Sequence, residues 1–190
     1  KILNFNKKKL LFSTNLLESL FNKKVNYHYN YVLSGIKFNR KKIKKKYDLI
    51  FYLRNHKNKN TDLQIKLARQ IAIKYNVVTI GKKINHKNIK NFGYIPRSKL
   101  NFILQRTKYS FISSENQYSL FAIDSLKNGT YIFYNKEKHS SKTLLKNMIP
   151  LDYSNQKLFT AISDKLKKKY INPKNFNPKN FNKIYGYFKI

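Results

Sequence analysis

The sequence predicts a doubly wound, mostly parallel α/β sheet with helices on both faces, followed by a C-terminal helix and an arm. Between residues 47 and 134, short apolar runs of strand length alternate with amphipathic helical segments. The runs are almost continuously apolar, as strands buried on both faces must be. An apolar share of 41% in 190 residues is enough for a real core. We therefore expect one domain, or one domain and part of another.

The expected elements follow from local patterns. Tyr47–Leu53 is an apolar strand, residues 55–60 form a polar loop, and the helical stretch 61–75 is capped by Thr61. The remaining expected elements are, in order, a strand over 77–80 ending at Gly81, a short strand over 89–94, a helix over 97–107 opened by Pro96, a strand over 109–113, a helix over 117–127, a strand over 130–134 and a helix over 156–170.

The regions outside this pattern differ in composition. Residues 1–40 are mixed, with a short helix expected over 14–21, and a lysine-rich run separates them from the first strand. The tail turns low-complexity, because Asn-Pro-Lys-Asn-Phe occurs twice in succession from Asn172. We expect the chain to divide into 1–40, 41–153 and 154–190. Because the first residue is Lys1 rather than Met, we expect the native start to be missing.

The charge is strongly positive. Lys and Arg total 41 and Asp and Glu total 8, so the formal charge is 41 − 8 = +33. Such a charge favours a polyanion partner, either nucleic acid or an anionic membrane face. A low-GC genome would produce the same abundance of Lys, Asn, Ile, Tyr and Phe in any protein. Both origins of the charge remain open.

Several site types are excluded or not expected. Cysteine is absent, so disulfides and thiolate metal sites are excluded, and the four histidines are scattered, so we expect no metal. No apolar run approaches the ~18 residues of a membrane span.

Two cations follow the first strand. Arg54 comes directly after it and Lys59 five positions later, just before a helix. In open α/β sheets, ligands bind beyond the carboxyl ends of the strands. Cations beside the free N–H groups of a helix start suit a diphosphate.

The most informative stretch runs from residue 113 to 129. Only 8 residues of the chain are acidic, yet Glu115 and Asp124 both occur here, at a strand-to-helix junction and within the following helix. Carboxylates at such a crevice bind sugar or ribose hydroxyls. The alternative is a helix-start Glu stabilised by the dipole together with a solvated Asp, and the spacing leaves both open.

Three motifs together resemble the large retaining glycosyltransferase family (group one) that has two Rossmann-like domains. Residues 52–60, with Arg54 and Lys59, resemble its G-R-x4-K-G loop. Residues 87–94 (KNIKNFGY) and 100–107 look like its next segment. Residues 113–129 (SSENQYSLFAIDSLKNG) are similar to its P-S-x-x-E-x-F-G-x-x-x-x-E-A-x-A-x-G segment. The likeness covers about residues 47–135 in the family's order, which implies a Rossmann-like, donor-binding domain over 41–153.

The resemblance implies a role for each matching position. Arg54 and Lys59 would bind the diphosphate and stabilise the leaving group, helped by the N–H groups of Ser119 and Leu120, and Glu115 would contact the transferred sugar. The nucleoside would be bound by Tyr94 and Ile95 around the base and by Asp124 at the ribose.

The match departs from the family in spacing. The interval from Glu115 to Asp124 is one residue longer than the family's glutamate pair, so aligning Asp124 places Asn116 at the first Glu. Asn60 replaces the loop glycine. The Glu-Asn pair also resembles fucosyltransferases of the same fold, which invert, so donor and stereochemistry stay open.

The function expected from the resemblance is transfer of a sugar from a nucleoside-diphosphate sugar to a lipid, glycan or other acceptor, with no metal or other cofactor. Residues 1–40 would be a remnant of the N-terminal acceptor domain and the interdomain linker. The fragment would then bind donor without turnover. We expect a cytoplasmic protein, with peripheral contact at the inner membrane face as an option. The alternative is a basic RNA-binding protein of ribosomal type.

Overall fold

A computed structural model describes residues 43–56, 59–113, 119–138 and 147–171. Its six strands form one sheet in which every pair of neighbours is parallel. The strands are β1 (Tyr47–Leu53), β2 (Val77–Gly81), β3 (Ile89–Asn91), β4 (Thr107–Phe111), β5 (Tyr131–Asn135) and β6 (Met148–Leu151). The helices are α3 (Thr61–Ile71), α4 (Arg97–Gln105), α5 (Leu120–Lys127) and α6 (Leu158–Lys167), with a short 3-10 turn, η3 (Lys136–Lys138).

The strand order is β3-β2-β1-β4-β5-β6. From β1 the chain winds outward through β2 and β3, and it then returns to the other side of β1 and winds outward through β5 to β6. The direction of winding therefore reverses between β1 and β4, which is the defining feature of a doubly wound, Rossmann-like sheet. The predicted fold class is confirmed.

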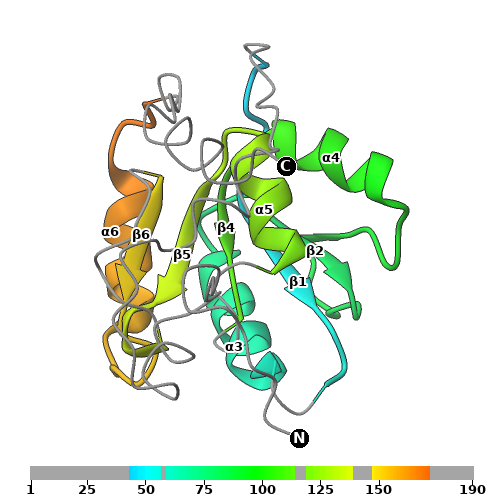
Figure 1. Cartoon of the computed structure of the whole chain (residues 1–190). Coiled ribbons are helices and arrows are strands. Elements are labelled where there is room, and N and C mark those ends of the chain that lie inside the picture. The colour runs from blue at the N-terminus through cyan, green and yellow to red at the C-terminus, as the bar shows by residue number, and fades with distance from the viewer. Residues whose placement is uncertain (1–42, 57–58, 114–118, 139–146, 172–190) are drawn as a thin grey trace, which may run out of the picture.

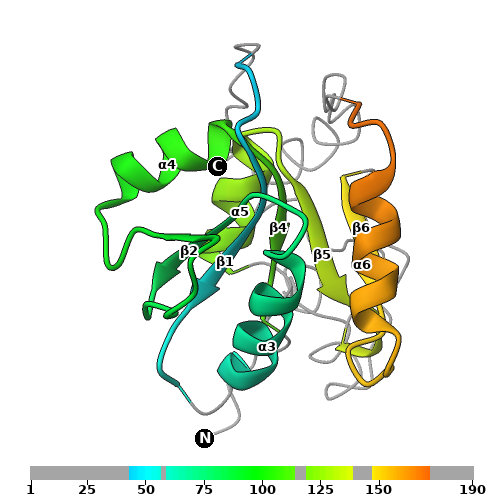
Figure 2. The same ribbon diagram turned by 180° about the vertical axis from the view of Figure 1, so that it is seen from behind.

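The helices cover both faces of the sheet (Figures 1 and 2). Residues that alternate along each strand enter two separate cores. Leu49, Phe51 and Leu53 of β1 pack toward α3 and α6, while Ile50 packs toward α4 and α5. None of the helices in the described part of the chain is long and apolar enough to cross a membrane.

Some expected boundaries need correction. The N-cap position of α3 is Asn60, which is in a left-handed conformation (φ 46°) and makes no side-chain capping hydrogen bond, whereas Thr61 is the first helical residue. Helix α5 begins at Leu120 rather than at residue 117, because the Ser119 hydroxyl accepts the N–H of Ala122 and so caps the helix there.

The edge strand β6 was not predicted from the sequence. Its four residues include Pro150, and only two of the four side chains are buried. Among the strands that the structure describes it pairs only with β5, so the missing N–H of proline is tolerated. The expected helix over 14–21 and the arm after residue 171 lie outside the described residues.

Candidate functional site

The carboxyl ends of all six strands meet at one edge of the sheet, because the sheet is parallel throughout. At the point where the winding reverses, the segments that follow β1 and β4 lie next to each other. Arg54 continues from β1, and residues 112 and 113 continue from β4 toward the start of α5. This is the crevice where ligands of doubly wound sheets bind.

The loop after β1 is held by the first two turns of α3. The Thr61 hydroxyl donates a hydrogen bond to the Arg54 carbonyl at 2.7 Å, and the Gln64 amide donates to the Lys59 carbonyl, also at 2.7 Å. Asn60 adopts the left-handed conformation at the position where the resembling family has glycine, which Asn tolerates better than most residues. These bonds fix the backbone of Arg54 and Lys59, the two predicted phosphate-binding cations, relative to α3.

The two predicted cations of this loop act on each other. Arg54 is exposed and Lys59 is half-buried. Burial lowers the pKa of the Lys59 amine, and the positive charge of Arg54 lowers that pKa further. An anion that binds here would relieve both effects, because it stabilises the protonated amine.

Aromatic contacts connect this loop to the start of α5. The Arg54 guanidinium lies 5.8 Å from the centre of the Tyr52 ring, and that ring lies 5.4 Å from the ring of Phe121. Phe121 is the second residue of α5, and Leu120 before it is 70% exposed. The backbone N–H groups at this helix start carry the positive end of the helix dipole. The Tyr52 ring thus connects Arg54 to the first turn of α5, while the joint action of Arg54 and Leu120 on a ligand stays a prediction.

The segment between β3 and α4 supplies the other predicted residues. Tyr94 is 74% exposed, and Ile95 packs against the core under α4 and α5. The preceding Gly93 has a φ of 66°, and its carbonyl accepts the N–H of Gly81 at 2.8 Å. This hydrogen bond fixes the segment to the end of β2, beside the crevice.

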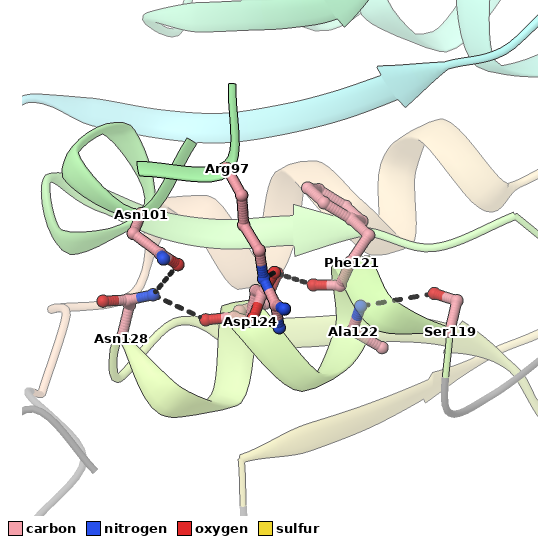
Figure 3. Close-up of polar contacts among 8 residues, drawn as sticks. Arg97, Asn101, Ser119, Phe121, Ala122, Asp124 and Asn128 are labelled. Carbon is pink, nitrogen blue, oxygen red and sulfur yellow. Dashed lines mark hydrogen bonds and ion pairs between the residues drawn. The ribbon is translucent and has the colours of Figure 1, made fainter. Parts of the chain in front are cut away.

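Asp124 is buried and paired with Arg97. Its two carboxylate oxygens accept hydrogen bonds from Nε and Nη2 of Arg97 at 2.8 and 2.7 Å (Figure 3). The Asp124 side chain is 3% exposed and that of Arg97 is 57% exposed. The hydrogen bond with Asp124, followed by its charge, raises the pKa of Arg97. The alternative of a solvated Asp is therefore wrong, while the ribose role of Asp124 stays a prediction.

A second polar contact joins α4 and α5 beside this pair. The Asn128 amide donates to the Asn101 side-chain oxygen at 2.9 Å and to the Asp124 carbonyl at 2.7 Å (Figure 3). The two helices are thus connected by two adjacent side-chain pairs, Arg97–Asp124 and Asn101–Asn128.

Glu115 and Asn116 lie outside the described residues, so their predicted contact with the sugar stays a prediction. Within the described ranges, no three His, Asp or Glu side chains come close enough together to hold a metal ion.

Sequence reasoning missed Arg97 and Gln64. The sequence contained a signal for Asp124, the partner of Arg97, and for Gln64 itself. Asp124 lies three residues after Phe121 on a buried helix face, where a carboxylate needs a cation. Gln64 precedes Ala68 and Ile71 by four and seven positions, which places a polar side chain on the buried face of α3.

Comparison with known proteins gives matches only at the level of structure. No protein-family model matches the chain, and no curated protein matches its sequence.

Two similar solved structures are glycosyltransferases. The C-terminal domain of a glycosyl transferase group 1 family protein (LpcC) from Francisella tularensis has a TM-score of 0.50 at 18% identity, over 70% of this chain and 84% of that one. A point mutant of S. aureus TarM, in complex with Fondaparinux, alpha-GlcNAc-glycerol and UDP, has a TM-score of 0.58 at 16% identity. That match covers 84% of this chain and 36% of TarM. The chain therefore has the Rossmann-like fold found in the C-terminal domain of a group 1 glycosyltransferase.

Proposed function

We propose that this chain is the donor-binding part of a glycosyltransferase, which takes a nucleoside-diphosphate sugar and passes the sugar to a glycan, lipid or other acceptor. The observation that carries the proposal is a series of contacts at the crevice between β1 and β4. The charges of Lys59 and Arg54 interact, and Arg54 is connected through the Tyr52 ring to Phe121 in the first turn of α5. The fold shared with glycosyltransferase domains supports it.

The diphosphate would lie between the loop after β1 and the start of α5. Arg54 and Lys59 offer charge, and the N–H groups of Ser119 and Leu120 offer hydrogen bonds. As the bond to the sugar breaks, negative charge grows on the departing nucleoside diphosphate. Fixed cations and N–H groups oppose that charge without rearranging, which lowers the barrier. The proposed chemistry requires no metal or other cofactor.

The rest of the substrate would extend to either side of the diphosphate. Tyr94 and Ile95 would contact the base, Asp124 would act at the ribose end, and Glu115 or Asn116 would contact the sugar. TarM is in complex with UDP and saccharides, which favours a nucleotide and a glycan as ligands here. An N-terminal domain would hold the acceptor, so the isolated chain would bind donor without turnover. The reaction would take place in the cytoplasm, with contact to an anionic membrane face as an option.

The test is nucleotide binding by the 190-residue chain and two arginine variants. Calorimetric titration with UDP, GDP, ADP and CDP should show a preference for one diphosphate. Arg54→Ala should weaken that binding about 10-fold or more, because it removes a charge-assisted contact. Arg69→Ala is the matched control: Arg69 is an exposed arginine in the last turn of α3, the helix that follows the Arg54 loop, at the end of that helix far from the crevice. Its loss should leave affinity within about twofold, since exposed charges at that distance are screened.

Other results would contradict the proposal. A chain that binds no nucleoside diphosphate is not a donor-binding domain. Equal losses in Arg54→Ala and Arg69→Ala would mean that only net charge matters. Tight RNA binding that falls steeply with salt, without nucleotide binding, would favour the RNA-binding alternative, which no comparison supports.

A further inference from the structure

Arg97 and Asp124 differ sharply in their access to solvent. The carboxylate is 3% exposed and both of its oxygens face the guanidinium, whereas the arginine is 57% exposed. A ligand at this surface of α4 and α5 therefore meets the guanidinium first. The carboxylate lies beneath it.

The pair leaves donors available on the exposed side. A guanidinium has five N–H groups in a rigid plane, and the two bonds to Asp124 use one on Nε and one on Nη2. Within the described part of the chain, Nη1 donates no hydrogen bond. The carboxylate fixes the plane of the guanidinium and thereby the direction of the remaining N–H groups.

The position of the pair indicates which part of a nucleotide it would meet. Arg97 follows Tyr94 and Ile95, the predicted base contacts, by two to three residues, and Asp124 lies one turn into α5, whose start faces the predicted diphosphate. Between base and diphosphate lies the ribose. A guanidinium has no acceptor, so it requires an oxygen acceptor from the ligand.

We propose that Arg97 contacts the nucleoside part of the donor, donating to a ribose 2′-hydroxyl or a base carbonyl oxygen, and that Asp124 is a positioning residue that acts through Arg97. This inference rests on the proposed function. It changes the chemistry expected at this end of the site, since the ligand would accept hydrogen bonds from an arginine instead of donating them to a carboxylate.

The experiment is a double-mutant cycle on binding. Calorimetry would measure the affinity for UDP or GDP, whichever binds more tightly, in the wild-type chain, Arg97→Gln, Asp124→Asn and the double variant. Arg97→Gln should weaken binding about 10-fold or more. Asp124→Asn should weaken it less, and it should cost nothing further once Arg97 is absent, because Asp124 acts only through it.

Two further variants separate ligand contact from helix packing. Asn101→Ala removes the neighbouring α4–α5 contact and leaves Arg97 in place, so affinity should stay within about twofold. Arg97→Lys keeps the charge without the planar fork and should recover only part of the loss. Circular dichroism would verify folding. If Arg97→Gln alone fails to fold because Asp124 is left unpaired, the double variant, which removes both charges, still reports the contribution of Arg97.

The choice of nucleotide identifies the acceptor. If the acceptor is the 2′-hydroxyl, the loss in Arg97→Gln should disappear with the 2′-deoxy analogue but persist with ADP. If it is a base carbonyl, the loss should persist with the 2′-deoxy analogue and disappear with ADP, because adenine has no carbonyl.

Several outcomes would overturn the inference. It fails if Arg97→Gln binds nucleotide as tightly as wild type, or if Asn101→Ala loses as much affinity as Arg97→Gln. It also fails if Arg97→Gln loses the same affinity for the preferred nucleotide, its 2′-deoxy analogue and ADP. Finally, it fails if Asp124→Asn lowers affinity as much in the absence of Arg97 as in its presence. In each of these cases, weaker nucleotide binding by Arg54→Ala would still support the proposed function. A wild-type chain that binds no nucleotide would remove both.

Discussion

The two faces of the sheet are built in different ways. Under α3 and α6, aromatic rings stack, as Tyr109 does on Phe133 at 5.2 Å, and buried hydroxyls donate to backbone carbonyls, as Tyr153 does to Ile112. Between α4 and α5, buried hydroxyls also donate to backbone carbonyls, as Ser125 does to Phe121, but this face adds two side-chain pairs, Arg97–Asp124 and Asn101–Asn128. Backbone carbonyls are present whatever the sequence, whereas a side-chain pair depends on both members. The α4–α5 face therefore contains groups that a single substitution leaves unpaired, whereas the α3–α6 face depends mainly on packing.

The largest expected effect is on the stacked face. Phe133 is fully buried between Tyr109 and the rest of that core. Phe133→Ala should lower the free energy of unfolding by about 3–5 kcal/mol, because it removes a large side chain and leaves a cavity. Urea unfolding would measure this. Nucleotide affinity of the folded variant should be unchanged, and a large loss of affinity at full folding would contradict the division between the faces.

A smaller loss of stability is expected on the α4–α5 face. Arg97→Ala leaves the Asp124 carboxylate buried without its cation, which should lower the free energy of unfolding by about 2 kcal/mol. This loss is smaller than for a fully buried pair, because Arg97 is more than half exposed. Adding Asp124→Ala should restore part of this stability, since the uncompensated charge is then gone. Urea unfolding of the single and double variants decides it. A double variant less stable than Arg97→Ala would mean that Asp124 stabilises the fold by other contacts.

The two faces were also unequally predictable from the sequence. Buried strands are apolar runs, so β1 was predicted with its correct bounds. The shared carboxyl edge of a parallel sheet predicts that Arg54 lies near the start of α5, and the contact of the Tyr52 ring with Phe121 agrees with this. The Arg97–Asp124 pair was not predicted, because it depends on how two helices pack across 27 positions of sequence. The edge strand β6 was missed because a single strand pairing requires little from its residues.

Lys45 lies just before β1, at the edge of the sheet opposite the crevice, and it contacts segments that follow helices of both faces. Its amine is 3.4 Å from the Gly129 carbonyl, just after α5, and 5.9 Å from the ring of Tyr170, after α6. Burial lowers the pKa of Lys45 to about 8, from 10.5. Below pH 8 the amine is charged in both states, so the folded state bears the whole desolvation cost. Between about pH 8 and 10.5 the unfolded state holds more protons, and stability contributed by this group rises with pH.

Lys45→Met should therefore stabilise the chain most at neutral pH. We expect the free energy of unfolding to rise by about 1 kcal/mol at pH 7, after allowing for the partial exposure of the amine. The difference from wild type should narrow as the pH rises from 8 to 10.5. Tyr153, whose pKa burial raises and whose hydroxyl donates to the carbonyls of Ile112 and Phe133, acts in the opposite direction but equally in both proteins, so its effect cancels in the difference. Lys46→Met, at the exposed neighbour, is the control and should show no such narrowing. If the difference in the free energy of unfolding between Lys45→Met and wild type stays constant with pH, methionine stabilises this position by packing and not by removing a charge. The position of Lys45 would then depend on packing alone, as the α3–α6 face does.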